Sequence, residues 1–352
     1  MTTASLLRTA LLGLALLAGC GGSGDREEEA AKRLKERGGV RATFGARPES
    51  REAIVRILRD RIRARDVDAT VRATGADRVE LAVADRSPER ARDTIATLTA
   101  VGRVAFYDWE GNVIGPAGVP SPEDVAVTGG VRAGQAGSLS LHDAVERARR
   151  RPAADDGDNT HAGLWYLVDR AAEEVEGPFR TQAEARDRRA AGQRIAHVQP
   201  GTVLLRAEDG GGWFVLEDDP ALGNQHLVDP RQRVDPRADG EPIVTFDFTD
   251  DGRRRFEAVT RELARRGAGA QLPGASPLES AQHFAIALDE EIITVPYVDY
   301  EAHPDGIDAE NGSQIQGGFT VESAQALAAL LRAGPLPPGA LVQQDEEVVP
   351  PA

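Results

Sequence analysis

The chain has 352 residues, of which 41% are hydrophobic and 5% aromatic, and its formal net charge is -15. This length allows one large domain or two modest ones. An acidic chain lacks the basic footprint that nucleic-acid binding requires, and it is not attracted to anionic lipid head groups.

The amino-terminal segment is typical of a signal peptide. Arg8 supplies a positive charge, residues 10–17 are apolar, and small residues lead to Cys20, the single cysteine. The apolar stretch is too short for a comfortable membrane-spanning helix, and no later segment is apolar for long enough. We therefore expect a signal peptide over residues 1–19 and a solvated, charged tether over residues 20–39.

Residues 40–108 predict a first compact unit. Strands are expected at 40–44, 69–73, 78–83 and 102–107, with helices opening after Ser50 and after Ser87. Ser87 followed by proline is a helix start, because serine caps the first turn and proline fits its first position. The order β-α-β-β-α-β is the ferredoxin-like pattern.

Further α+β elements are expected after residue 108, including an extra β-α-β-β insert near 160–220. Within the insert, Thr181 and Glu184 form a capping box, and two strands flank the turn at 209–211. After it come a strand at 243–248, a helix capped by Thr249, and a hairpin whose turn contains Asp289. We expect that turn to be solvated.

Residues 313–352 end the chain with a strand end, a glycine pair, a helix and a last strand. Gly317 and Gly318 allow backbone angles that a Cβ atom would forbid. Thr320 is a suitable cap for the helix 321–332, and Gly334 suits its end. The expected inward face of this helix is Val321, Ala324, Leu327, Ala328 and Leu331.

Three stretches, in order, resemble the extracytoplasmic first domain of SecD, an accessory subunit of bacterial protein export. Residues 242–252 (PIVTFDFTDDG), continuing to Phe256, are similar to its PxVxFxFxxxGxxxF segment. Residues 283–296 (HFAIALDEEIITVP) are similar to its LAIVLDGxVxSAP hairpin, except that Glu290 replaces the glycine. Residues 313–320 (SQIQGGFT) and 326–337 (ALAALLRAGPLP) complete the resemblance.

The resemblance implies an α+β fold, in which a ferredoxin-like base carries an inserted head over residues 109–312. Residues 313–352 would return to the base, with 321–332 as its helix and 340–349 as its last strand. It also implies a head that hinges on the base, with Trp109, Gly111, Gly317 and Gly318 as candidate hinge residues. The implied partners are an unfolded exported polypeptide and subunits of the Sec translocon.

The segment Leu17 to Cys20 resembles a bacterial lipobox, which implies lipidation of Cys20 and cleavage before it. A plain secretory signal with an incidental cysteine is the alternative. Acyl chains such as palmitate would hold the protein on the extracytoplasmic face of the cell membrane. Full SecD carries several membrane helices, and none is expected in this sequence.

No catalytic constellation stands out. The six histidines are scattered without metal-ligand spacing, and no cofactor motif is present. We therefore expect no enzyme, no metal and no cofactor. A lipid-anchored, SecD-like export module is the main hypothesis, and a cell-envelope binding lipoprotein without an export role is the alternative. A hydrolase with a site assembled only in the folded chain is a third.

Overall fold

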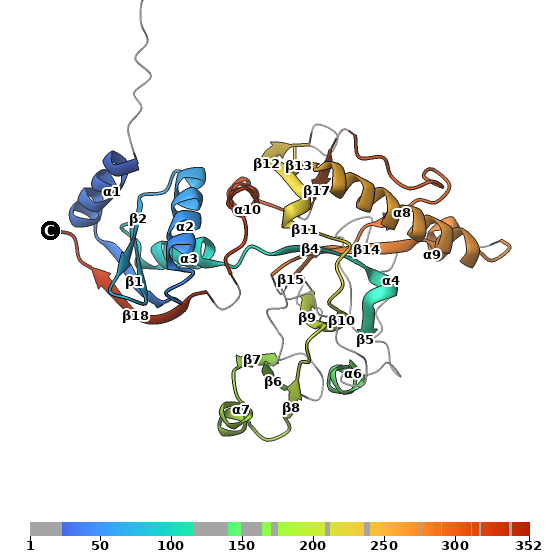
Figure 1. The fold of residues 1–352 in the computed structure, drawn as a ribbon, viewed down its shortest axis with the longest axis horizontal. Helices are drawn as coiled ribbons and strands as arrows, with labels where there is room; N and C mark the ends of the chain where they lie inside the picture. The colour runs from blue at the N-terminus through green and yellow to red at the C-terminus, as the bar shows by residue number, and fades with distance from the viewer. Residues whose placement is uncertain are drawn as a thin grey trace, which may run out of the picture.

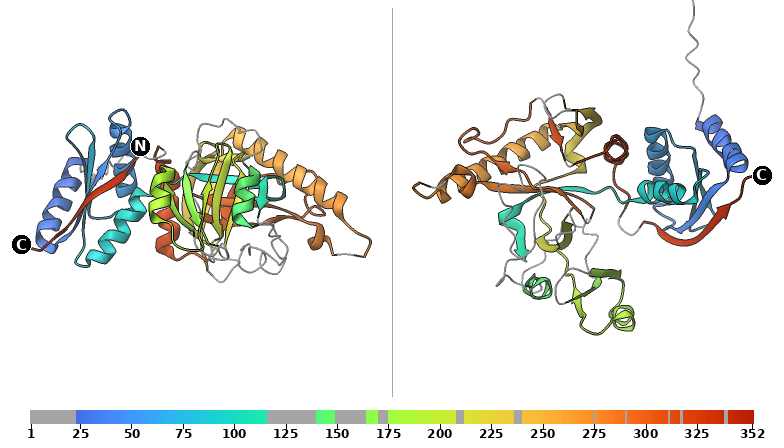
Figure 2. Two further views of the ribbon diagram at one scale, coloured as in Figure 1. Left: turned by 90° about the horizontal axis from the view of Figure 1, so that it is seen from below. Right: turned by 180° about the vertical axis from the view of Figure 1, so that it is seen from behind.

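A computed structural model describes the chain as two lobes joined by two chain segments (Figures 1 and 2). The residues described are 23–115, 140–148, 164–169, 175–207, 212–235, 240–274, 276–289, 291–310, 312–316, 318–337 and 340–352. We call the lobe of residues 23–99 and 341–352 the base, and the lobe of residues 104–333 the head. Cys20 and Gly317 lie outside the described residues.

The base is built on a four-stranded antiparallel sheet of order β18-β1-β3-β2. The strands are β1 (Gly39–Gly45), β2 (Ala69–Thr74), β3 (Arg78–Ala84) and β18 (Val342–Val349). Two helices, α2 (Arg51–Arg65) and α3 (Pro88–Thr99), share one hydrophobic core with the sheet. The predicted cap of α3 is confirmed, because the Ser87 side chain accepts a hydrogen bond from the Arg90 amide. This is the ferredoxin-like arrangement expected from the sequence.

The last strand of this sheet is not the one predicted within the first unit. Residues expected to close the base at 102–107 instead form β4 (Val104–Asp108), which pairs with β14 (Gln282–Leu288) in the head. β18 takes the place beside β1, in a register that runs from Gly39 opposite Val349 to Gly45 opposite Val342. The first part of the base therefore ends near residue 99, where α3 ends, and not at residue 108.

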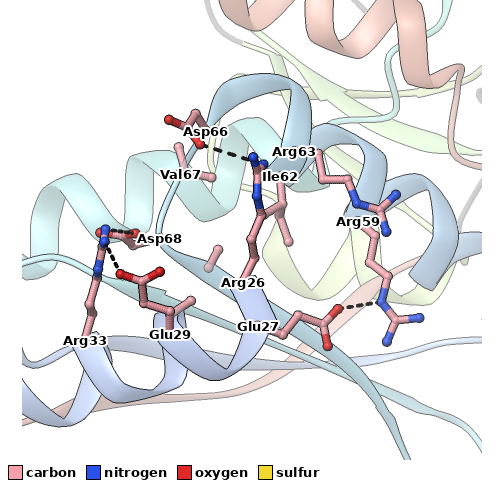
Figure 3. A pocket seen from close by; sticks show the side chains of 12 residues that line it. Arg26, Glu27, Glu29, Arg33, Arg59, Ile62, Arg63, Asp66, Val67 and Asp68 are labelled. Atoms are coloured by element: carbon pink, nitrogen blue, oxygen red, sulfur yellow. Dashed lines mark hydrogen bonds and ion pairs between the residues drawn. The ribbon is translucent and has the colours of Figure 1, made fainter. Parts of the chain in front are cut away.

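The expected solvated tether is a docked helix. α1 (Ser23–Arg37) buries Ala30 and Leu34, and Leu34 packs beside Ala82 and Ala84 of β3. A pocket of about 210 Å³ between α1 and α2 is lined by ion pairs (Figure 3). Arg33 lies 2.5 Å from Asp68, and Arg59 lies 2.7 Å from Glu27. Apolar contact and ion pairing together hold α1 against the base, because helical spacing puts alanine and leucine on one face.

The head contains a mixed sheet of order β11-β4-β14-β15-β9-β10-β5 among the described residues, with β16 also pairing with β14. Its further strands are β5 (Val113–Gly115), β9 (Thr202–Ala207), β10 (Trp213–Glu217), β11 (Leu222–Gly223), β15 (Glu291–Thr294) and β16 (Tyr297–Val298). The β9–β10 hairpin was expected in the insert, but it belongs to this sheet, since β9 pairs in parallel with β15.

A second head sheet, of order β12-β13-β17, shares a core with two helices and the first sheet. Its strands are β12 (Leu227–Val234), β13 (Pro242–Phe248) and β17 (Ser313–Ile315), and a 3-10 turn, η1 (Asn224–His226), precedes β12. The long helix α8 (Asp250–Ala270) starts at the predicted cap, since Thr249 accepts from the Gly252 amide. Short α9 (Pro277–Ser280) follows α8, and the core is rich in aromatic rings: Phe106, Phe246, Phe256 and Phe284.

The last helix, α10 (Val321–Ala333), lies on the side of the head that faces the base (Figure 1). The expectation that it belongs to the base is wrong, because Ala324, Leu327 and Leu331 lie in the head core. It also contacts α2 of the base. Thr320 caps it as predicted, but Val321 is 42% exposed and not on the buried face.

The insert forms a small separate sheet of order β7-β6-β8. It consists of β6 (Trp165–Val168), β7 (Val175–Phe179), α7 (Gln182–Arg188) and β8 (Arg194–His197), and α6 (Leu141–Ala148) precedes it. The capping box of Thr181 and Glu184 is confirmed. Residues of α6, β6 and β8 pack on β9 and β10 of the head sheet, so the insert is attached to the head and not to the base.

Candidate interlobe joint and cleft

Two chain segments cross between base and head, and glycine lies in each. The first crossing, residues 100–103, joins α3 to β4, and Gly102 has φ of +79°. The second crossing joins α10 to β18, and Gly334 has φ of +81°. The two crossings touch, because the Leu336 amide donates to the Val101 carbonyl at 2.7 Å. We call residues 100–103 and 334–337 together the joint.

A single buried side chain of the base, Arg61 of α2, binds both crossings. Its Nη1 donates to the carbonyls of Leu98 (2.8 Å) and Ala100. Its Nη2 donates to the carbonyls of Val101 (2.8 Å) and Gly334 (3.0 Å). Arg61 is 0% exposed, and burial lowers its pKa to about 10, so it stays charged at neutral pH. The Arg61 side chain thus fastens both crossings to the base.

The head holds the first crossing from the other side. The Asp289 carboxylate accepts from the Arg103 amide at 2.8 Å, and the Asp289 amide donates to the Arg103 carbonyl at 2.7 Å. Asn224 donates to the Gly102 carbonyl and accepts from the Val104 amide, both at 2.9 Å. The boundary between base-held and head-held backbone therefore falls between Val101 and Gly102.

Asp289 is not the solvated turn residue that the sequence suggested. It has φ of +56° at the β14–β15 turn, and burial raises the pKa of its carboxyl, while the amides of Arg103 and Gly102 oppose that shift. The turn is held against the joint because both its side chain and its amide bind Arg103. The contact between this hairpin turn and the first crossing could not be predicted from the hairpin pattern.

An open cleft of about 1150 Å³ lies beside the joint, with walls from both lobes. The base contributes the end of α2 and part of α3, and the head contributes β9, β10, β14, β15 and α10. Its lining includes Asp289 and Leu330, which connect it to the joint. A second hollow of about 820 Å³ is lined by both crossings together with β11 and η1. Both hollows would change shape if the angle between the lobes changed.

Two of the predicted hinge residues, Trp109 and Gly111, lie inside the head and not at a crossing. They belong to the short helix α4 (Trp109–Asn112), where Trp109 is 1% exposed and packs edge-on against Phe214 at 5.0 Å. The predicted crossing near these residues is wrong, because the chain has already entered the head sheet at β4.

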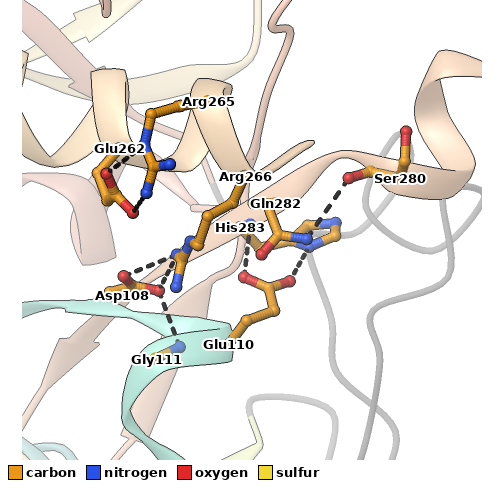
Figure 4. A network of polar contacts seen from close by, with 9 residues as sticks. All are labelled: Asp108, Glu110, Gly111, Glu262, Arg265, Arg266, Ser280, Gln282 and His283. Carbon is orange, nitrogen blue, oxygen red and sulfur yellow. Dashed lines mark hydrogen bonds and ion pairs between the residues drawn. The ribbon is translucent and has the colours of Figure 1, made fainter. Parts of the chain in front are cut away.

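A polar network holds the ends of α4 (Figure 4). Arg266 of α8 donates to both oxygens of Asp108, at 2.6 and 2.7 Å, and Asp108 also accepts from the Gly111 amide. Glu110 accepts from the His283 amide at 2.8 Å and lies 2.6 Å from its ring Nδ1. Contacts on both sides of Trp109 leave this turn strongly anchored.

The remaining hinge candidate that the structure describes, Gly318, is exposed. Its φ is +62°, and a Cβ atom there would have no neighbour within 4 Å. It lies just before α10, within the head, so it is not at a crossing either. The structure does not bring together the three predicted hinge residues that it describes, and the role of all four in motion stays a prediction.

Sequence reasoning missed Arg61, although a signal exists. Arg61 follows Ile54 and Leu58 at helical spacing, so a charged residue occupies the apolar face of α2. A charge at such a position needs partners, and four backbone carbonyls supply them. In the part of the chain that the structure describes, no group of three His, Cys, Asp or Glu residues could hold a metal ion. No described helix has the length and hydropathy needed to cross a membrane.

Comparison with known families gives a match within the head. Residues 202–338 match the family model described as SecDF, P1 head subdomain. This segment runs from β9 to the second crossing, and it includes α10, in agreement with the assignment of that helix to the head.

Curated relatives are protein translocase subunits SecD. That of Rhodobacter capsulatus is 33% identical over 156 residues, covering 44% of this chain and 24% of the relative. That of Rickettsia bellii is 29% identical over 154 residues, covering 44% and 25%. That of Aquifex aeolicus is 26% identical over 153 residues, covering 44% and 26%. The chain thus spans about a quarter of the length of these relatives.

Solved structures of SecDF also align with the chain. A crystal structure of SecDF in its super-membrane-facing form covers 89% of this chain and 30% of that one, at 19% identity and a TM-score of 0.47. A second structure, described as a membrane component SecDF that enhances protein export, covers 87% of this chain and 98% of that one, at 18% identity and a TM-score of 0.44.

Proposed function

We propose that this chain is a non-catalytic, SecD-like module that assists protein export by moving its head relative to its base. The observation that carries the proposal is the match of residues 202–338 to the SecDF P1 head subdomain. The structure supports it independently, since the head is inserted between α3 and β18 of a ferredoxin-like base. The partners are an unfolded exported polypeptide and subunits of the Sec translocon.

The joint is the proposed hinge. Each crossing has a glycine with positive φ, and large-scale closure is usually absorbed by a few residues at element ends. Arg61 and Asp289 hold the two sides of the first crossing, so a change in lobe angle concentrates at Val101 and Gly102. The predicted hinge at Gly317 and Gly318 would, in this proposal, adjust the start of α10 inside the head.

The module is proposed to sit on the extracytoplasmic face of the cell membrane, anchored by acyl chains on Cys20. The described chain begins with α1 at Ser23, close in sequence to Cys20, and α1 is docked on the base. A lipid there would hold the base near the membrane. A Cys20→Ser variant should move from the membrane fraction to the soluble fraction, and the mature wild-type amino terminus should carry the lipid by mass spectrometry.

The proposal is tested by depletion followed by profiling of secreted proteins. A general export defect, with precursors accumulating in the cell, is the expected result. Site-specific photo-crosslinking from position 322 in the cleft should capture Sec subunits or exported chains, while position 52 on the outer side of α2 should not. Normal export after depletion would leave the alternative, a cell-envelope binding lipoprotein. The small β7-β6-β8 sheet supports that alternative. It lies before the segment that matches the SecDF family model, so the match gives no export role to this sheet.

A further inference from the structure

The cleft beside the joint has a lining that selects for a particular kind of ligand. Its apolar part consists of side chains from the head sheet, from α10 and from the segment just before α10, several of them partly exposed: Trp213, Leu288, Ile293, Phe319, Leu327 and Leu330. A volume of about 1150 Å³ is larger than a single side chain needs, and it suits a stretch of several residues. Apolar side chains of an unfolded segment could pack against these lining side chains.

The charged part of the lining is mainly acidic. Four carboxylates, of Asp93, Asp289, Glu291 and Glu322, face two guanidinium groups, of Arg65 and Arg206. Glu291 and Arg206 neutralise each other at 3.2 Å, and Asp289 is committed to the joint. Asp93 and Glu322 are exposed, and neither carboxylate has a hydrogen bond or ion pair with a described residue.

The two free carboxylates come from different lobes. Asp93 belongs to α3 of the base, and Glu322 belongs to the first turn of α10 in the head. Arg65 at the end of α2 also lines the cleft, and its terminal nitrogen Nη1 is buried without a hydrogen-bond partner. A peptide offers both complements, since backbone carbonyls accept from arginine and basic side chains pair with carboxylates.

We propose that the interlobe cleft binds an extended polypeptide segment in which apolar side chains are flanked by lysine or arginine. The proposal rests on the proposed function, and it adds a sequence preference and a location to it. Because Asp93 and Glu322 belong to different lobes, basic residues on both sides of an apolar centre would connect the base to the head. A bound segment of this kind would favour one angle of the joint.

The test uses fluorescein-labelled heptapeptides and the mature chain with Cys20→Ser, measured by fluorescence anisotropy at low and high salt. One peptide has a Leu-Phe-Leu centre with two lysines on each side. Matched peptides replace the lysines with glutamates or serines, or replace the centre with serines. We expect the lysine-flanked apolar peptide to bind at least about tenfold more tightly than each of the other three, with an advantage that shrinks at high salt.

A pair of variants assigns the preference to the cleft. Asp93→Asn with Glu322→Gln removes the two free carboxylates and should weaken lysine-flanked binding by about five- to tenfold, leaving the serine-flanked peptide unchanged. The control, Glu52→Gln with Glu89→Gln, removes the same charge from exposed positions on α2 and α3 outside the cleft lining. The control should bind all four peptides as the wild type does.

Two results would overturn the inference. One is equal affinity for lysine-flanked and glutamate-flanked peptides, and the other is an equal loss of binding in the cleft variant and the control. Either can occur while depletion still causes an export defect, in which case the export function stands and the cleft preference falls. Normal export with lysine-selective binding would instead remove the export role and leave the peptide site.

Discussion

Two glycine-containing turns of this chain, the α4 turn and the first crossing, are stabilised in opposite ways. At α4, charged side chains and an aromatic core hold the backbone: Asp108 binds Arg266, Glu110 binds His283, and Trp109 is buried. All of these contacts lie within the head. At the crossing, Arg61 of the base holds one side of Gly102 and Asp289 of the head holds the other.

We infer that a glycine can serve as a hinge where the segments on its two sides are held by different lobes. Gly111 is bounded by contacts to one lobe, so a bend there would break the head core. Gly102 is bounded by contacts to two lobes, so a bend there breaks few contacts within either one. The same logic applies to Gly334, whose carbonyl binds Arg61 while α10 before it belongs to the head.

The largest expected effect is at the α4 turn. Trp109→Ala should lower the free energy of unfolding of the head by about 3–5 kcal/mol, because a fully buried aromatic side chain is lost. Urea unfolding followed by fluorescence measures this. The distribution of base–head distances should not change below the unfolding transition. A loosened angle between otherwise folded lobes would mean that this turn, and not the crossing, controls the angle.

At the crossing, Arg61→Met should cost about 2–3 kcal/mol, because four carbonyl groups lose a charged donor in a buried site. The expected result differs from that of Trp109→Ala, because the angle between the base and the head should also vary more widely. Small-angle X-ray scattering would report a larger radius of gyration. Arg61→Lys keeps the charge but reaches fewer carbonyls, so it should fall between wild type and Arg61→Met in both measurements.

Alanine at two glycines sharpens the contrast further. Gly318→Ala should cost about 1 kcal/mol, because φ of +62° disfavours a Cβ atom that meets no other neighbour. Gly102→Ala should cost about 2 kcal/mol or more, because its Cβ atom would also lie 2.7 Å from Arg61 Nη2. In an Arg61→Met background the excess at Gly102 should shrink toward the Gly318 value. Equal costs in the wild-type background would mean that Arg61 does not crowd the crossing.

The smallest effect concerns pH. Burial raises the Asp289 pKa above its ordinary value of 3.8, so the folded state holds this proton more tightly than the unfolded state does. The contribution of Asp289 to stability is therefore greatest at low pH, and it declines as pH rises from about 3.8 through the raised pKa. Asp289→Asn cannot titrate at this position. As pH rises over that window, the unfolding free energy of the wild type should therefore fall relative to that of the variant. A difference that is constant from pH 3.5 to 7 would contradict this.

Local signals predicted much of the fold. The caps at Ser87, Thr181, Thr249 and Thr320 were each found, because a capping side chain acts on residues two or three positions away. Hairpin pairing was equally local. Which sheet a strand joins was not local, so residues 102–107 were assigned to the base and the β9–β10 hairpin to the insert. The docking of α1 was missed for the same reason, since its partners, Asp68 and β3, are distant in sequence.

The candidate site was harder to predict than the fold. The resemblance supplied the idea of a base and a head, yet three of its four candidate hinge residues, Trp109, Gly111 and Gly318, lie inside the head, and Gly317 lies outside the described residues. The residues that form the joint are an arginine in a helix and an aspartate in a turn, each unremarkable alone. Their importance comes from contacts between segments as far apart as Arg61 and Gly334. Only the apolar spacing around Arg61 gave a hint from the sequence.

The most direct test of the hinge is the distance distribution between the lobes. Spin labels at Glu52→Cys on α2 and Leu272→Cys after α8, in a Cys20→Ser chain, place one probe on each lobe at exposed positions. Pulsed electron paramagnetic resonance should give a distribution that broadens in Arg61→Met and stays as in wild type in Gly318→Ala. A distribution that is unchanged in Arg61→Met, but broadened in Gly318→Ala, would contradict a hinge at the crossings.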